Sequence, residues 1–204
     1  MDTIKSTSFI KEYQKNKKRR PFNKHYFEML CDNICEVLLE WCGKTWVGQE
    51  KSDETKNAYQ NFFEAFNNLI YYFEENIDKL NYLEKDFLEK VAFRGNVYRL
   101  LGSNNHLNNS KIRPLFNTIF VSWSKNKENF YLESKLYGPI TRLYCQIEKP
   151  NFGIDIEGFT DFYHHHISDD VMIARGNERE VVFPTIRKTI IYIEYLRENK
   201  YDNT

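Results

Sequence analysis

A change in the spacing of apolar residues near residue 90 constrains the fold of this chain more than any other feature. Before that point apolar side chains recur every three or four residues, over 22–41 and again over 59–88. This spacing predicts amphipathic helices. After it, apolar residues gather in short segments rich in β-branched and aromatic side chains, which are typical of strands. Helices followed by strands predict an α+β fold with an antiparallel or mixed sheet.

The helical part is predicted to contain two long apolar runs and a basic N-terminal segment. The first helix should end near Gly43, where a glycine-containing loop over 43–54 begins. The second run exceeds an average helix and is predicted to break near 78–81. We expect three regions: a flexible arm over 1–20, a helix and loop over 21–54, and the main domain over 55–204.

A cluster of cations lies at the end of the expected arm. Its members are Lys15, Lys17, Lys18, Arg19 and Arg20. Such a run most often forms a solvated arm, and the alternative is an arm that contacts phosphates or docks a partner.

The strand predictions follow the short apolar segments of the second half. They are 91–94, stopped by Gly95, and then 118–122, 142–147, 153–156, 180–183 and 188–195. Residues 127–136 are predicted to be mildly helical.

Composition excludes several classes of protein. The net charge is zero and the pI is about 7.0, which does not indicate a strongly basic nucleic-acid binder. No apolar run approaches the roughly 20 residues of a membrane span, and no signal peptide is evident, so a cytoplasmic location without membrane contact is expected. The chain contains neither GxGxxG after a strand nor GxxxxGK[ST], so it lacks the Rossmann and P-loop signatures.

Cysteine and histidine do not indicate a metal site. Cys31, Cys35, Cys42 and Cys145 form no CxxC pair, so we expect reduced, mostly buried thiols and no zinc. His164-His165-His166 is interpreted as a loop triplet, because adjacent residues of an extended chain point to alternating sides. A nucleophile pair between Cys145 and this triplet stays open, without specific support.

Three short segments carry side chains suited to chemistry. In Glu178-Arg179-Glu180, residues two apart on a strand would project two carboxylates to the same side. In Ser122-Trp123-Ser124, two hydroxyls could fix the rotamer of a neighbouring carboxylate, while Trp123 points to the core. In Phe93-Arg94-Gly95, a guanidinium suited to phosphate oxygens precedes a glycine that lets a ligand approach the backbone. Each pattern alone is common at strand ends.

Together and in this order, the segments resemble the Arg–Ser–Glu class of mono-ADP-ribosyltransferases, which includes the clostridial binary toxins and the arginine-specific ectoenzymes. The resemblance covers roughly residues 55–196. It implies an ADP-ribosyltransferase-like core, a split antiparallel or mixed sheet, with an N-terminal helical region, and NAD as substrate without a metal.

The resemblance also implies roles for individual residues. Glu180 would bind the ribose next to nicotinamide and stabilise the developing positive charge, and Glu178 would orient or deprotonate the nucleophile. Ser122 and Ser124 would hold Glu180 and the ribose. Arg94, followed by Gly95, would grip the pyrophosphate.

Two assignments within the resemblance need a choice. Tyr98-Arg99 is a second aromatic–arginine pair, and Arg94 is preferred because of its following glycine and its strand context. The segment before the Glu strand would shape the acceptor site, which places Asp169, Asp170 and Arg175 there.

The acceptor remains open. Glu178 favours an arginine-type protein acceptor by analogy with the family, and the basic run leaves a nucleic-acid acceptor open. We expect an intracellular toxin of bacterial or phage origin, from a toxin–antitoxin or phage-defence locus, with an antitoxin or immunity protein as partner. The alternatives are an NAD glycohydrolase and a non-catalytic α+β interaction protein.

Overall fold

The computed structural model describes residues 3–44, 52–102, 121–128, 139–169, 179–183 and 190–197. Its helices are α1 (Thr3–Lys17), α2 (Lys24–Lys44), α3 (Asp53–Glu75), the 3-10 helix η1 (Ile77–Lys79), α4 (Tyr82–Val91) and α7 (Ile156–His166). Its strands are β1 (Ala92–Phe93), β2 (Gly95–Gly102), β3 (Val121–Ser124), β4 (Ile140–Ile147), β5 (Gly153–Asp155), β6 (Glu180–Phe183) and β7 (Tyr192–Arg197). The predicted α+β class is therefore confirmed.

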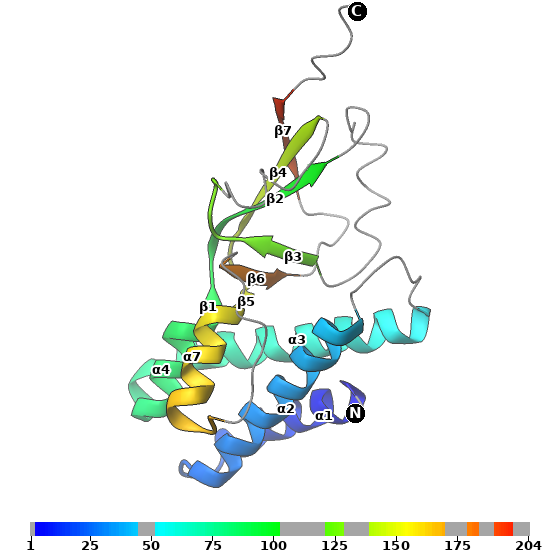
Figure 1. The fold of residues 1–204 in the computed structure, drawn as a ribbon. Helices are drawn as coiled ribbons and strands as arrows, with labels where there is room; N and C mark the ends of the chain where they lie inside the picture. Colours follow the sequence, from blue (N-terminus) through cyan, green and yellow to red (C-terminus); the bar gives the residue numbers. More distant parts are fainter. Residues whose placement is uncertain are drawn as a thin grey trace, which may run out of the picture.

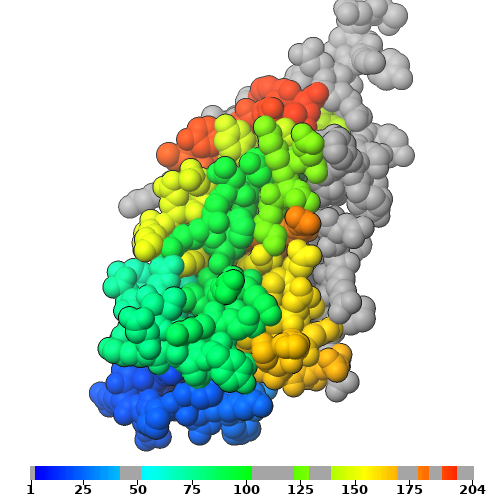
Figure 2. All heavy atoms as spheres, turned by 90° about the vertical axis from the view of Figure 1, so that its left-hand side faces the viewer, coloured from blue at the N-terminus to red at the C-terminus, as the bar shows by residue number. Residues whose placement is uncertain are grey.

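The helices and the strands occupy opposite ends of the molecule (Figure 1). Figure 2 shows this division from the side, with α1 and α2 in blue at one end and β7 in red at the other. One apolar cluster nevertheless continues from Ile10 in α1 to Phe183 in β6. The two ends therefore share a core.

The long helical run breaks near the predicted place because two caps meet there. Asn76 ends α3, and Asn81 begins α4 with a capping box. The Asn81 side chain accepts a hydrogen bond from the backbone N–H of Glu84 at 3.0 Å, and the Glu84 carboxylate accepts one from the N–H of Asn81 at 3.1 Å. Both bonds satisfy amide groups that a helix start leaves without partners.

The predicted flexible arm over 1–20 is wrong for most of its length. Residues 3–17 form α1, which packs along α3 and α2 and buries Ile10 and Tyr13. The Tyr13 hydroxyl donates to Glu84 at 2.8 Å, and the Lys17 ammonium contacts the same carboxylate at 2.6 Å. Polar pairing with a buried glutamate therefore holds α1 in place, and its weak apolar periodicity gave no sign of this.

The histidine triplet is the last turn of α7 and not a loop. Asp155 caps this helix by accepting a hydrogen bond from the N–H of Gly158 at 3.1 Å, and the chain turns there from β5 directly into the helix. His166 contacts Asp86 of α4 at 2.8 Å. Histidines at a helix C-terminus also lie favourably with respect to the helix dipole. The described residues contain no cluster suited to hold a metal ion.

The seven described strands form one antiparallel sheet in the order β1-β5-β6-β3-β2-β4-β7. The sheet is curled: β3 and β6 run across the direction of β2 and β4 (Figure 1). Among the described residues, Tyr98 and Ser124 pair β2 with β3, whereas β2 and β4 pair along eight residues. The described pairing of β2 with β3 is therefore shorter than that of β2 with β4.

Gly95 is the point where the chain passes between two parts of this sheet. The segment before it, β1, pairs with β5, and the strand after it, β2, pairs with β4. Gly95 has a φ of 139°, a backbone conformation that residues other than glycine rarely adopt. The predicted strand over 91–94 is present as the shorter β1 and ends before Gly95, whereas β2, which begins at this glycine, was not predicted.

Among the helices that the structure describes, none combines the length and the apolar character needed to cross a bilayer. Cys31, Cys35 and Cys145 are buried free thiols, as predicted. The Cys42 side chain lies outside the described residues.

Candidate functional site

The serine and glutamate segments lie side by side at the start of β6. In the antiparallel pair of β3 and β6, Ser124 lies opposite Glu180 and Ser122 lies opposite Val182. The Ser122 hydroxyl donates a hydrogen bond to the Glu180 carboxylate. Two residues that are 58 positions apart are thus joined, and a hydroxyl donor restricts the carboxylate to one orientation.

The second serine is tied to the backbone of its own turn. The Ser124 hydroxyl accepts a hydrogen bond from the backbone N–H of Asn126 at 3.1 Å, and its residue is only 9% exposed. Trp123 between the two serines is buried in the core, as its alternation on the strand predicted. The serines therefore share one side of β3, opposite to the tryptophan.

β6 presents Glu180 at the end of a strand that is otherwise fully buried. Val181, Val182 and Phe183 are at most 4% exposed, whereas Glu180 is partly exposed. β3 and β5 pair with β6 along its two edges. The carboxylate is therefore fixed by a rigid strand at the border between the core and solvent.

The residue before Glu180 interrupts the extended chain. Arg179 has a φ of 46°, in the left-handed region that non-glycine residues seldom adopt. Its carbonyl accepts a hydrogen bond from the backbone N–H of Lys125 at 3.0 Å. The strand geometry that predicted two glutamates on one side therefore begins only at Glu180. Glu178 itself lies outside the described residues.

Of the two candidate arginines, Arg99 is the one beside the serine–glutamate pair. It lies in the middle of β2, and its guanidinium donates to the backbone carbonyl of Ser122 at 3.0 Å. This bond bridges β2 and β3 close to the described pair of Tyr98 and Ser124. Arg99 therefore braces the strand whose serine holds Glu180.

Arg94 lies outside this arrangement, between β1 and β2. Its guanidinium makes two hydrogen bonds to the Glu74 carboxylate, at 2.7 and 2.9 Å. The guanidinium carbon also lies 3.8 Å from the centre of the Phe152 ring. Strand context favoured Arg94 over Arg99 in the sequence, and that reason is overturned because β2 begins after Arg94. The glycine that follows Arg94 is explained by the corner in the chain.

A charged cluster that was not predicted from the sequence lies at the edge of the site. Lys125 follows the second serine directly, and its ammonium lies 2.5 Å from Asp155 and 3.6 Å from Glu157. It thereby connects the end of β3 to the start of α7, next to the turn at Arg179. Its place immediately after the serine motif was the one signal that could have indicated it.

The predicted acceptor-site residues are described only in part. Asp169 is exposed in the turn after α7. Asp170 and Arg175 lie outside the described residues. Of the residues predicted for the site, the structure brings together Glu180, Ser122, Ser124 and Arg99.

This arrangement suits the stabilisation of a positive charge. A carboxylate held by a hydroxyl on a rigid strand needs little reorganisation when a cationic centre develops in front of it, and such preorganised groups contribute strongly to catalysis. The carboxylate could equally accept hydrogen bonds from the hydroxyls of a sugar. No family model, no curated protein and no solved structure matches the chain.

Proposed function

We propose that this protein is an NAD-dependent mono-ADP-ribosyltransferase that cleaves the nicotinamide–ribose bond and transfers ADP-ribose to a protein or nucleic-acid acceptor. The observation that carries the proposal is the hydrogen bond between Ser122 and Glu180, with Arg99 bound to the carbonyl of the same serine. With Tyr98-Arg99 as the arginine segment, the arginine, serine and glutamate segments lie on three neighbouring strands, β2, β3 and β6.

In the proposed reaction Glu180 binds the hydroxyl of the nicotinamide ribose and stabilises the oxocarbenium-like charge as nicotinamide leaves. The bond between the ribose anomeric carbon and the nicotinamide nitrogen breaks, and its electron pair stays with nicotinamide. The acceptor then forms a bond to the same carbon and loses a proton, which Glu178 takes up. NAD is consumed as a substrate, and no metal takes part.

Arg99 takes the position of the motif arginine in this proposal, in place of Arg94. It braces the serine strand, whereas the hydrogen bonds of Arg94 to Glu74 support a structural role. By resemblance, the protein would act as an intracellular bacterial or phage toxin, in the cytoplasm, with an antitoxin or immunity protein as partner.

The test is incubation of the purified protein with labelled NAD and cell lysate, followed by measurement of free nicotinamide and of label in protein and nucleic acid. Glu180→Gln should lower nicotinamide release by about 100- to 1,000-fold, since it removes the charge that stabilises the transition state. Glu128→Gln is the matched control, because Glu128 is exposed and lies just beyond the end of β3. It should react like the unmodified protein.

The outcomes separate the competing functions. Label that resists protease and is lost to nuclease identifies a nucleic-acid acceptor, and the reverse identifies a protein acceptor. Free ADP-ribose without transfer indicates an NAD glycohydrolase. If the protein releases no nicotinamide and labels no acceptor, the proposal is overturned. The non-catalytic interaction protein is then the function that the result favours.

A further inference from the structure

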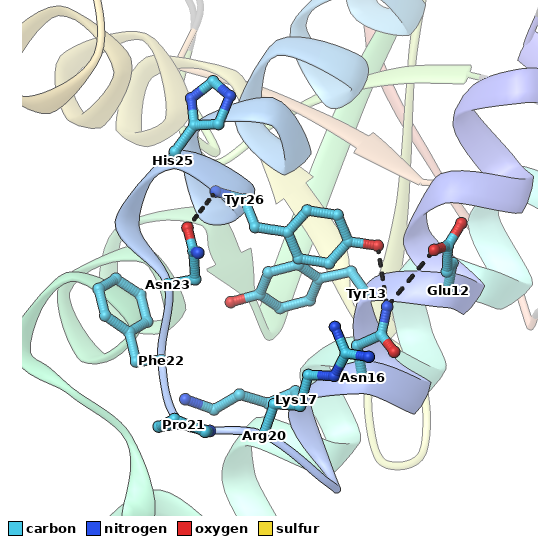
Figure 3. Close-up of a pocket in the computed structure, with 10 residues that line it drawn as sticks. All are labelled: Glu12, Tyr13, Asn16, Lys17, Arg20, Pro21, Phe22, Asn23, His25 and Tyr26. Carbon is cyan, nitrogen blue, oxygen red and sulfur yellow. Dashed lines mark hydrogen bonds between the residues drawn. The ribbon is translucent and has the colours of Figure 1, made fainter.

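A cavity of about 440 Å³ lies at the helical end of the molecule, between the end of α1 and the start of α2. Its lining includes the aromatic residues Tyr13, Phe22 and Tyr26 and the cations Lys17 and Arg20 (Figure 3). None of its lining residues belongs to β2, β3 or β6. The cavity is therefore separate from the proposed catalytic site, and its volume is within the range of small-molecule sites.

The charge around this cavity is mostly positive. Residues 13–27 contain six lysines and arginines and no aspartate or glutamate, although the whole chain has zero net charge. One carboxylate, that of Glu12, also lines the cavity, and it accepts a hydrogen bond from the Asn16 side chain at 3.4 Å. Lys15, Lys18, Arg19 and Arg20 are exposed. The structure thus gathers positive charge around the cavity at a density that the overall composition does not indicate.

The walls of the cavity are fixed by contacts within the protein. The rings of Tyr13 and Tyr26 stack with their centres 5.4 Å apart. The Tyr26 hydroxyl accepts a hydrogen bond from the Asn16 side chain at 3.2 Å, and the backbone N–H of Tyr26 donates to the Asn23 side chain at 3.0 Å (Figure 3). Lys17 is anchored by Glu84. A ligand would therefore meet a site whose aromatic walls need little ordering.

The turn that carries the cations is equally well defined. The backbone N–H groups of Arg19 and Arg20 both donate to the carbonyl of Asn16 at 2.9 Å. Pro21 follows them and restricts the backbone before α2 begins. In Figure 3, Arg20 and Lys17 lie on one side of the tyrosine rings, and His25 lies on the opposite side.

We propose that this cavity binds a nucleotide unit of a single-stranded nucleic acid, with the base against the aromatic residues and the flanking phosphates at Arg19, Arg20, Lys15 and Lys18. A cationic track beside aromatic side chains is the combination by which proteins bind single strands without sequence preference. Phosphates supply the negative charge that the cations attract, and a base supplies the planar ring that the cavity accepts. A free nucleotide shares this chemistry on a smaller scale.

The test is fluorescence anisotropy of the full chain with a labelled ten-nucleotide single-stranded RNA and its DNA counterpart, at low and at moderate salt. Arg19→Glu combined with Arg20→Glu should weaken binding about tenfold or more and reduce the salt dependence, because phosphate contacts are lost. Lys5→Glu combined with Lys11→Glu is the matched control. It makes the same change in net charge at exposed positions of α1 outside the cavity lining, and it should change binding less than twofold.

The aromatic contribution has its own variant. Phe22→Leu keeps an apolar side chain at this half-buried position and removes the ring, so it should weaken binding about fivefold or more, which corresponds to the loss of one stacked base. Thermal unfolding of this variant, close to that of the unmodified chain, shows that the loss is local.

Equal weakening by the two charge-reversed pairs would show diffuse attraction and overturn the proposal. Absence of binding at low salt would also overturn it, as would tight binding of anionic vesicles or an acidic peptide that oligonucleotides do not displace. Competition by a mononucleotide as effective as that by the ten-nucleotide strand would assign the cavity to a free nucleotide. Because binding needs neither NAD nor Glu180, Glu180→Gln should bind normally, and failure here is distinct from failure of the catalytic proposal.

Discussion

At the scale of single residues, the two arginines that compete for one role differ in what they touch. Arg99 holds the carbonyl of the serine that orients Glu180, and Arg94 makes a two-bond contact with Glu74. Replacing each should therefore affect different properties of the protein.

We expect Arg99→Ala to lower nicotinamide release about 100-fold, since a small displacement of the reacting groups has an effect of this size. Arg94→Ala should instead lower the free energy of unfolding by about 1–3 kcal/mol, because Glu74 loses its charged hydrogen-bond partner. Its activity per folded molecule should change little. Steady-state kinetics and urea unfolding of both variants measure this contrast, and an inactive but fully stable Arg94→Ala would reverse the assignment.

A variant of Glu178 can separate the two steps of the proposed reaction, cleavage of NAD and transfer of ADP-ribose. If it deprotonates the acceptor, Glu178→Gln should lower the transfer of ADP-ribose by about 100-fold or more while nicotinamide release continues. Measuring both products from one reaction gives the ratio directly. Parallel loss of both products would place Glu178 in the cleavage step.

At the scale of elements, α7 can pack closely against α4 because Gly158 has no side chain. A Cβ added to Gly158 would lie 1.9 Å from the backbone carbonyl oxygen of Lys90. That carbonyl belongs to the last turn of α4, and backbone cannot rotate away as a flexible side chain could. Gly158 therefore allows the start of α7 to approach the end of α4.

Gly158→Ala should lower the free energy of unfolding by about 1–3 kcal/mol, as overpacking of a well-packed site does. Asp161→Ala at an exposed position of the same helix is the control and should change stability by less than about 0.5 kcal/mol. Chemical denaturation of both variants provides the measurement. Equal free energies of unfolding for the two variants would mean that α7 can move away from α4 without loss of stability, which would contradict this prediction.

Elements with strong periodicity were predictable, and elements held by polar contacts were not. The apolar positions of α2 and α3 indicated these helices, and β6 was predicted with its observed bounds. α1 was missed because its apolar periodicity is weak and its placement depends on the distant Glu84. α7 was missed although its buried residues Ile156, Phe159 and Tyr163 recur at helical spacing, because 153–156 was predicted as a strand and the histidine triplet as a loop.

The site shows the same limit. The serine and glutamate segments were found from their order in the chain, but their adjacency depends on β6 lying between β5 and β3. The choice between the arginines depended on where β2 begins, and that is decided by the backbone conformation of Gly95. Strand order cannot be predicted from local sequence, because it depends on packing across the whole sheet.

At the scale of the whole molecule, buried groups that hold their protons link stability to pH. Burial raises the pKa of Cys145 to about 12, and burial together with nearby acids raises that of Cys35 to about 12. Burial and Glu84 raise the pKa of Tyr13 as well. In the unfolded chain these groups lose their protons at lower pH, so the folded state binds more protons between about pH 9 and 12.

Stability should therefore be unaffected by these groups below about pH 9 and should fall as pH rises towards 12, because the unfolded state binds fewer protons in that range. Urea unfolding at pH 7, 9 and 10.5 measures the decline. Cys145→Ala should make it shallower, since it removes one of the contributing groups. A flat profile from pH 7 to 10.5 would contradict the link between burial and proton release.

The interleaved order of the sheet has a consequence for the time at which the protein is assembled. β6 is the strand that joins β5 and β1 to the rest of the sheet, yet only β7 follows it among the described strands. During synthesis the helices can form as they emerge, whereas the pair of β1 and β5 joins the other described strands of the sheet only when residues 180–183 arrive. Contacts between distant segments form slowly. The helical end should thus acquire its structure first on the ribosome, and the site around Glu180 should be among the last parts of the molecule to form.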